Sequence, residues 1–256
     1  MQILYQNSFS RSGETLLLRC FEQHPRVKVL HQLLDLKDEH KLQYDIFKHI
    51  KSQKPSNINF SEEEKSILGI VNEDILLVKN ATFEVRKPHY GFTLIRNPFS
   101  VYKSYMTLGN EVDIRLQMRR WINQIDKRLL FVLNETDLVH SFCAIYTRKM
   151  GVLININQPL IRYEDLVSDS KNALLKLCKH LNLTFHQELL FSHENYPKDK
   201  KGHGGIDLSA PIMNNDFNKL PELSEYEEHI IYSYTSNILK LCKYKIDFKN
   251  RTLTCN

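Results

Sequence analysis

A polar turn near the beginning of the sequence holds residue types that bind anions. An apolar run at residues 3–5 leads into the turn, at residues 8–13, and an apolar periodic segment follows at residues 15–21. A strand, a tight turn with glycine and a helix in this order direct backbone N–H groups and the positive helix end toward an anion. Arg11 adds charged donors and Ser12 adds a hydroxyl. The stretch predicts a phosphate-binding turn, with an ordinary strand-to-helix turn as the alternative. The Walker A motif, GxxxxGK(S/T), does not occur in the sequence.

A second set of anion-binding residue types follows a strand predicted at residues 90–95. Arg96 ends that strand, Pro98 begins a helix, and Ser104 follows Arg96 by eight residues. Proline suits the first helical turn because its missing N–H costs nothing there. A guanidinium and a hydroxyl at this spacing suit a phosphate, although Arg-Asn-Pro alone is also a common helix start.

A lysine follows a third apolar strand, predicted at residues 74–78. In α/β sheets, ligands bind in the crevice outside the C-terminal ends of the strands. We therefore expect Lys79 to point into that crevice, with a solvated lysine at the strand exit as the alternative.

In chain order, these motifs resemble those of the sulfotransferases that use 3′-phosphoadenosine 5′-phosphosulfate (PAPS). Residues 10–17, SRSGETLL, resemble the family's 5′-phosphosulfate loop, (K/R)SGTTxL, and residues 96–104 match its 3′-phosphate motif, RNPxxxxxS. Residues 162–166, RYEDL, resemble the segment whose tyrosine meets the adenine edge. Residues 199–205 resemble the C-terminal RKGxxG loop that folds over the 3′-phosphate. The likeness covers most of the chain, and is closer to the carbohydrate and tyrosylprotein branch than to the cytosolic phenol branch.

The resemblance implies a site for PAPS and its product PAP, and it implies no metal. The cofactor-binding residues that it implies are Arg11, Ser12, Gly13, Glu14, Thr15, Leu16, Arg96, Ser104, Tyr163, Lys200, Lys201 and Gly202. Glu14 departs from the family, which usually has a small hydroxyl residue there. A carboxylate in this loop repels the donor unless it points away or pairs with a cation.

The implied reaction is in-line transfer of a sulfuryl group from PAPS to a hydroxyl or amine acceptor, such as a glycan or a protein tyrosine. Arg11 and Lys79 are expected to stabilise the charge on departing PAP. The acceptor also needs a base within reach. The histidine of the family's KTH motif is absent, because residues 79–81 read KNA. His31 is the first candidate base, with Asp35 and Glu14 as alternatives.

Two other functions remain open on the sequence. A P-loop small-molecule kinase would need the Walker lysine and a Mg²⁺-binding Ser/Thr, which are missing. A non-catalytic relative that binds PAP or another nucleotide is favoured by Glu14 and by the missing KTH histidine.

The elements that must position these residues alternate between strands and helices. Strands are predicted at residues 3–5, 27–30, 74–78, 90–95 and 158–163. This alternation predicts an α/β fold with a parallel, doubly wound sheet of about five strands, helices on both faces and a P-loop-like phosphosulfate-binding turn. We expect a single domain, residues 1–256, with mobile segments near 51–65 and 192–215 and a polar tail at 245–256.

Composition limits the partners. The chain has 35 basic and 30 acidic residues, a net charge of +5 and 42% hydrophobic residues. This mild positive charge suits an anionic ligand and an acidic glycan or protein acceptor. Without a nucleic-acid motif, no nucleic-acid partner is expected.

Five scattered cysteines without a CxxC pair favour free thiols in a reducing compartment. The first strand begins almost at Met1, which leaves no room for a signal peptide, and no apolar run of about 18 residues predicts an integral membrane segment. We expect a cytoplasmic location, or the Golgi lumen if an N-terminal anchor precedes this sequence. The sequence specifies neither the acceptor nor the oligomeric state.

Overall fold

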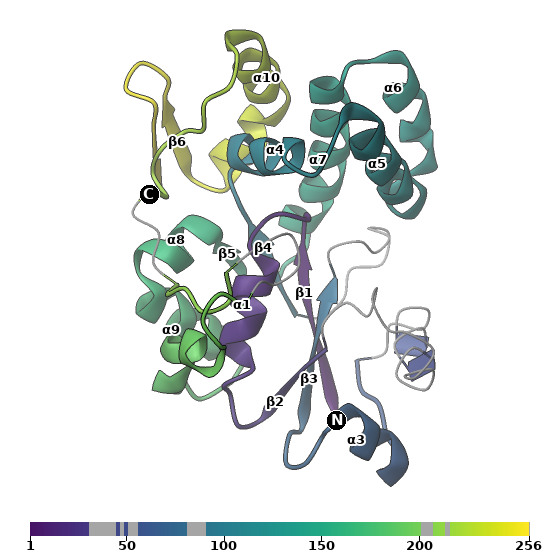
Figure 1. Ribbon diagram of the computed structural model, residues 1–256, viewed down its shortest axis with the longest axis vertical. Helices are drawn as coiled ribbons and strands as arrows, with labels where there is room; N and C mark the ends of the chain where they lie inside the picture. Colours follow the sequence, from purple (N-terminus) through teal and green to yellow (C-terminus); the bar gives the residue numbers. More distant parts are fainter. Residues whose placement is uncertain are drawn as a thin grey trace.

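The computed structural model describes residues 1–30, 45–46, 49–50, 56–80, 91–200, 207–212 and 216–255. The central sheet consists of β1 (Gln2–Ser8), β2 (Val27–Leu30), β3 (Ile75–Asn80), β4 (Gly91–Ile95) and β5 (Leu160–Arg162). The strand order is β2-β3-β1-β4-β5, and every neighbouring pair is parallel. The predicted five-stranded parallel sheet is confirmed, and the first strand of the chain lies in its middle (Figure 1).

Alternate side chains of the strands pack against helices on opposite faces of the sheet, as the two-residue period of a strand requires. The face that includes Leu4 packs against α1 (Glu14–Phe21) and α9 (Ser170–His180). The face that includes Ile3 packs against α3 (Glu62–Leu68). Both faces of the sheet are therefore buried, which explains the nearly continuous apolar runs of β1 and β3. The prediction of helices on both faces is confirmed.

A second group of helices lies at the end of the sheet where β1 and β3 finish (Figure 1). The group comprises α4 (Pro98–Met106), α5 (Glu111–Ile125), η2 (Lys127–Leu129), α6 (Leu130–Glu135), α7 (Leu138–Asn155) and α10 (Glu225–Leu241). Phe9, in the polar turn after β1, packs into this group. Its ring centroid lies 6.2 Å from that of Tyr105, 5.7 Å from Phe142 and 5.1 Å from Tyr146. These contacts anchor the turn to α4 and α7.

The end of the chain differs from the prediction. Instead of a polar tail, the structure has an antiparallel hairpin of β6 (Tyr244–Asp247) and β7 (Thr252–Cys255). Tyr244 and Leu253 are buried in the core of the helical group, and this burial stabilises the hairpin.

Two further segments hold more regular structure than we expected. The predicted mobile segment at residues 51–65 overlaps α3, which begins with a capping box of Ser61 and Glu64. The segment at residues 192–215 overlaps η3 (Gln187–Asn195), and part of it lies outside the described residues. No helix in the described part of the chain is long and apolar enough to cross a bilayer.

Candidate functional site

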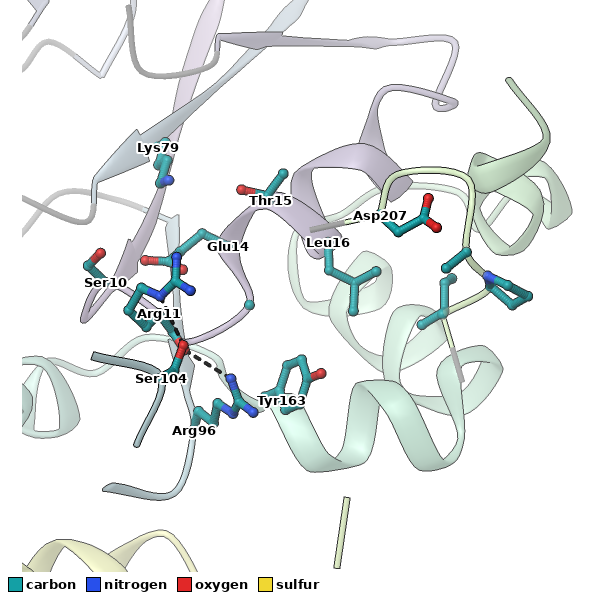
Figure 2. Close-up of a pocket in the computed structure, with 14 residues that line it drawn as sticks. Ser10, Arg11, Glu14, Thr15, Leu16, Lys79, Arg96, Ser104, Tyr163 and Asp207 are labelled. Carbon is teal, nitrogen blue, oxygen red and sulfur yellow. Dashed lines mark hydrogen bonds between the residues drawn. The ribbon is translucent and has the colours of Figure 1, made fainter. Parts of the chain in front are cut away.

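A pocket of about 290 Å³ lies where β1, β3 and β4 end, between the polar turn and residues 207–212 (Figure 2). Most of the site residues expected from the sequence meet here, although they come from separate strands and helices. The residues that line the pocket are Ser10, Arg11, Gly13, Glu14, Thr15, Leu16, Lys79, Arg96, Ser104, Tyr163, Asp207, Ala210, Pro211 and Ile212.

The backbone of the polar turn is shaped for an anion. Arg11 has φ 72° and Gly13 has φ 95°, so two residues of the turn adopt the left-handed region. Gly13 is also the N-cap of α1, and no side chain caps this helix. The first N–H groups of a helix have no partner within the helix, and they carry its positive end. An uncapped α1 therefore presents a donor-rich, positive end to the pocket.

Two arginines and a serine link the turn to β4 and α4. Arg11 donates a hydrogen bond from Nε to Ser104 Oγ at 2.9 Å, and Arg96 donates from Nη1 to the carbonyl oxygen of Arg11 at 3.2 Å (Figure 2). The guanidinium of residue 96 thus lies against the turn rather than on the far side of the sheet. Arg11, Arg96 and Lys79 place three cationic side chains around one pocket.

Tyr163 forms one side of the pocket. It is the first residue of α8 (Tyr163–Ser168), and its ring lies under the Arg96 guanidinium, whose central carbon is 4.4 Å from the ring centroid. The ring also packs on Gly13. A Cβ at residue 13 would lie 2.4 Å from Tyr163 Cδ2, so only glycine fits. A flat aromatic surface next to paired cations suits a ligand that combines a base with phosphates.

A buried carboxylate joins the two segments that supply Arg96 and Tyr163. Glu164, at 1% exposure, accepts hydrogen bonds from the backbone N–H of Asn97 at 3.0 Å and from Asn97 Nδ2 at 2.7 Å. Its other oxygen accepts from the Tyr244 hydroxyl at 2.6 Å. The hairpin that we expected to be a tail therefore helps to hold the site.

Two polar side-chain atoms in and beside the polar turn are buried without a partner in the described part of the chain. Within the described residues, Ser12 Oγ and Arg96 Nε are buried and have no hydrogen-bond partner. Buried polar groups are usually paired, because an unpaired one costs on the order of 1–3 kcal/mol. Of the two residues only Arg96 lines the pocket, and its free Nε, together with the uncapped start of α1, fits an anionic ligand such as a nucleotide phosphate or phosphosulfate.

Glu14 is buried although it lines the pocket. Its side chain accepts a hydrogen bond from Ser8 Oγ at 3.3 Å, and the residue is 4% exposed. Lys149 of α7 is 2% exposed, and burial lowers its pKa to about 7, while the negative charge of Glu14 partly opposes this. Burial, and then Glu14, raise the pKa of Tyr105 well above its usual value, and Arg11 opposes that shift. The charge of Glu14 thus acts on the pKa of both Lys149 and Tyr105.

The far side of the pocket was not predicted. Asp207, Ala210, Pro211 and Ile212 form this wall, and no motif in the sequence marks them. Arg19, a buried residue in the last turn of α1, donates from Nη1 to the Leu208 carbonyl at 2.5 Å. Its Nε donates to Ser192 Oγ of η3 at 3.1 Å. Arg19 is a single arginine in an apolar helical segment, and this pattern was the sequence signal for a buried side chain that bonds to another segment.

The remaining predicted residues do not line the pocket or are not described. Ser12 is fully buried, Lys200 is exposed, and neither is among the lining residues. Lys201 and Gly202 lie outside the described residues, as do the candidate bases His31 and Asp35.

No family model matches the chain, and neither does any curated protein. Among solved structures, the chain is similar to a sulfotransferase domain from the curacin biosynthetic pathway. The TM-score is 0.53 at 20% sequence identity, and the match covers 92% of this chain and 97% of that one. At this level of identity the likeness concerns the fold.

Two weaker likenesses extend over a similar share of the chain. Retinol dehydratase in complex with androsterone and the inactive cofactor PAP gives a TM-score of 0.47 at 13% identity, covering 93% of this chain and 80% of that one. A mouse sulfotransferase complexed with PAP gives 0.48 at 9% identity, covering 93% and 85%.

Proposed function

We propose that this chain is a PAPS-dependent sulfotransferase. The observation that carries the proposal is the convergence of Arg11, Ser104 and Arg96 beside the uncapped start of α1. These residues belong to the two motifs that resemble the family's 5′-phosphosulfate loop and 3′-phosphate motif. The fold shared with a sulfotransferase domain supports the same function.

The chemistry of the pocket suggests how a doubly phosphorylated adenosine binds. Arg11 and the N–H groups of the turn suit the 5′ side, while Arg96 and Ser104 suit the 3′-phosphate. Tyr163 offers an aromatic surface to the base. The unpartnered Arg96 Nε would gain an acceptor.

PAPS supplies an activated sulfuryl group, so the protein need only orient the reactants and stabilise the charge that develops. Arg11 and Lys79 are cations at the pocket, and we assign this role to them. Loss of one preorganised donor of this kind costs about 2.7–4 kcal/mol in the barrier. We assign the acceptor's proton to a base near the end of β2, and His31 is our first candidate because it follows Leu30 directly.

The acceptor class remains a hydroxyl or amine, with a glycan or a protein tyrosine as the preferred candidates. The net charge of +5 favours an acidic molecule. We also propose a reducing compartment, such as the cytoplasm, because all five cysteines are free thiols and four of them are buried. Incubation with labelled PAPS and a panel of acceptors tests the acceptor class.

Calorimetric titration with PAP and AMP tests the cofactor. We expect PAP to bind at least about tenfold more tightly, because the 3′-phosphate gains charge-assisted hydrogen bonds from Arg96 and Ser104. Arg96→Ala should remove this preference and keep the fold. Lys240→Ala, at an exposed lysine of α10, is the control for the lost charge. Equal affinities of the wild type for PAP and AMP would refute the proposed function.

A further inference from the structure

The stack of Arg96 on Tyr163 is held by the residue that follows each of them (Figure 2). Asn97 follows Arg96, Glu164 follows Tyr163, and both Asn97 and Glu164 are buried. The Glu164 carboxylate accepts from the Asn97 backbone N–H at 3.0 Å and from Asn97 Nδ2 at 2.7 Å. Because the two backbones are joined one residue beyond the stack, this carboxylate fixes how the guanidinium lies on the ring.

The beginning of the β6–β7 hairpin holds the same segment from outside the pocket. The Tyr244 hydroxyl donates to the second Glu164 oxygen at 2.6 Å. Arg162, the residue before Tyr163, donates from Nη1 to the Cys242 carbonyl oxygen at 3.1 Å, and its guanidinium lies 5.8 Å from the centre of the Tyr244 ring. Both chain neighbours of Tyr163 are therefore bonded to the end of α10 or to the start of the hairpin.

A carboxylate at position 164 has enough acceptors for all of these donors. An ionised carboxylate accepts through two oxygens, each with two lone pairs, and the two donors of Asn97 and the Tyr244 hydroxyl use both oxygens. A buried donor that loses its acceptor bears a desolvation cost. A shift of Arg96 relative to Tyr163 would break at least one of these bonds, so the network resists that shift.

We propose that Glu164 and Tyr244 are positioning residues that set the Arg96 guanidinium for the 3′-phosphate. Neither residue lines the pocket, and each acts through Arg96, whose Nε has no hydrogen-bond partner within the described residues. The inference rests on the proposed function, because the ligand group that Arg96 would bind is the 3′-phosphate of PAP. It assigns part of cofactor selection to a hairpin outside the pocket.

A double-mutant cycle between Tyr244 and Arg96 tests the proposal. The variants are Tyr244→Phe, Arg96→Ala and the double variant, and calorimetry measures the affinity of each for PAP and for AMP. Tyr102→Phe is the matched control, because this buried tyrosine of α4 also donates to a glutamate, Glu227 Oε1, at 2.8 Å. Tyr102 does not line the pocket.

Tyr244→Phe should weaken PAP binding about five- to tenfold and AMP binding about twofold or less, because AMP lacks the phosphate that Arg96 would bind. In the Arg96→Ala background the same substitution should change PAP affinity about twofold or less, since its effect passes through the missing guanidinium. Tyr102→Phe should leave the ratio of the two affinities unchanged, although both Phe variants lose a buried hydrogen bond.

A purely structural role of Tyr244 would give a different pattern. The proposal is overturned if Tyr244→Phe weakens PAP and AMP by the same factor, if it weakens PAP equally in both backgrounds, or if Tyr102→Phe changes the PAP preference as strongly.

Glu164→Gln tests the carboxylate in the same way. Its single acceptor oxygen can still serve Asn97, but its amide nitrogen cannot accept from Tyr244. Glu164→Gln should therefore reduce the PAP preference about as much as Tyr244→Phe, and combining the two should add about twofold or less. Fully additive losses would contradict a role of Glu164 as the link. If Tyr244→Phe does not fold, Glu164→Gln takes its place in the cycle with Arg96→Ala.

A spectroscopic measurement separates this inference from the proposed function. In the protein without ligand, the Arg96 Nε–H resonance in a nitrogen–proton NMR spectrum reports the position of the guanidinium over the Tyr163 ring, and Arg96→Ala assigns it. Tyr244→Phe should shift this resonance and Tyr102→Phe should not, and an unshifted resonance in Tyr244→Phe overturns the proposal. If the wild type binds PAP and AMP equally, the proposed function fails, whereas the resonance still decides whether Tyr244 positions Arg96.

Discussion

Two structural constraints at position 13, a positive φ and the lack of space for a Cβ, together require glycine. Its φ of 95° lies in the left-handed region, and a Cβ would lie 2.4 Å from the Tyr163 ring. Gly13→Ala should lower the free energy of unfolding by about 1–3 kcal/mol, because the substituted residue is strained and displaces the ring. PAP binding should weaken by about tenfold or more, because the ring and the N–H groups of the turn shift together. Urea unfolding and calorimetry measure the two effects.

Gly151 is the matched control for that prediction. It lies within α7, and a Cβ added there meets no atom within 4 Å. Gly151→Ala should therefore raise the free energy of unfolding by about 0.5–1 kcal/mol and leave PAP binding unchanged. A Gly13→Ala variant that binds PAP like the wild type would show that the close packing of residue 13 on the Tyr163 ring does not matter for PAP binding.

Lys149 should also make stability depend on pH. Its pKa is about 7 when folded and near 10.5 when unfolded, so between these values the unfolded chain binds more protons and stability rises with pH. From pH 6.5 to 8 the free energy of unfolding should rise by about 1 kcal/mol more in the wild type than in Lys149→Met. Urea unfolding at the two pH values measures this difference, and parallel changes in the two proteins would contradict it.

Single residues were predictable where a local pattern constrained them. Gly13, Arg11 and Arg96 stand in short motifs next to strand ends, and a strand end in a parallel sheet lies at the ligand crevice. Ile212 could not be predicted, since it joins the site through tertiary packing and no local pattern marks it.

At the scale of elements, α1 connects the ligand to the far wall of the pocket. Gly13 is the N-cap of the helix at the turn, and Arg19 in its last turn donates to Ser192 and to the Leu208 carbonyl. The same helix therefore positions both ends of the pocket.

Arg19→Met should lower the free energy of unfolding by about 1–3 kcal/mol, because the buried Leu208 carbonyl loses its donor. PAP and AMP should lose affinity by the same factor, since the wall at residues 207–212 does not distinguish them. Ser192→Ala, which removes only one acceptor of Arg19, should have a smaller effect on both measurements. A change in the preference for PAP over AMP would contradict this role.

Elements were predicted best where one period extended over many residues. The strands of the sheet followed from their apolar runs, but α3 was missed because its first turn, at residues 62–64, is entirely acidic. The β6–β7 hairpin was missed because Tyr244 and Leu253 are its buried anchors among polar neighbours. Two apolar residues in a polar segment do not establish a strand period, and their packing against the helical group decides the structure.

At the scale of the molecule, the alternation of strands and helices was sufficient to predict a parallel sheet with its site at one edge. The strand order was not predictable from that alternation. It depends on which strands pair across long loops, and these pairings follow from burial on both faces of the sheet.

The central position of β1 has a consequence for biosynthesis. β1 leaves the ribosome before its two neighbours, β3 and β4, which begin at Ile75 and Gly91. Until then, both of its hydrogen-bonding edges are open to other chains, and such non-local pairing is slow. Because Ile212 also lines the pocket, a ligand can meet the complete pocket of a nascent chain only after residue 212 has been made. A chaperone that shields β1 during translation should therefore raise the yield of folded protein more than added nucleotide does.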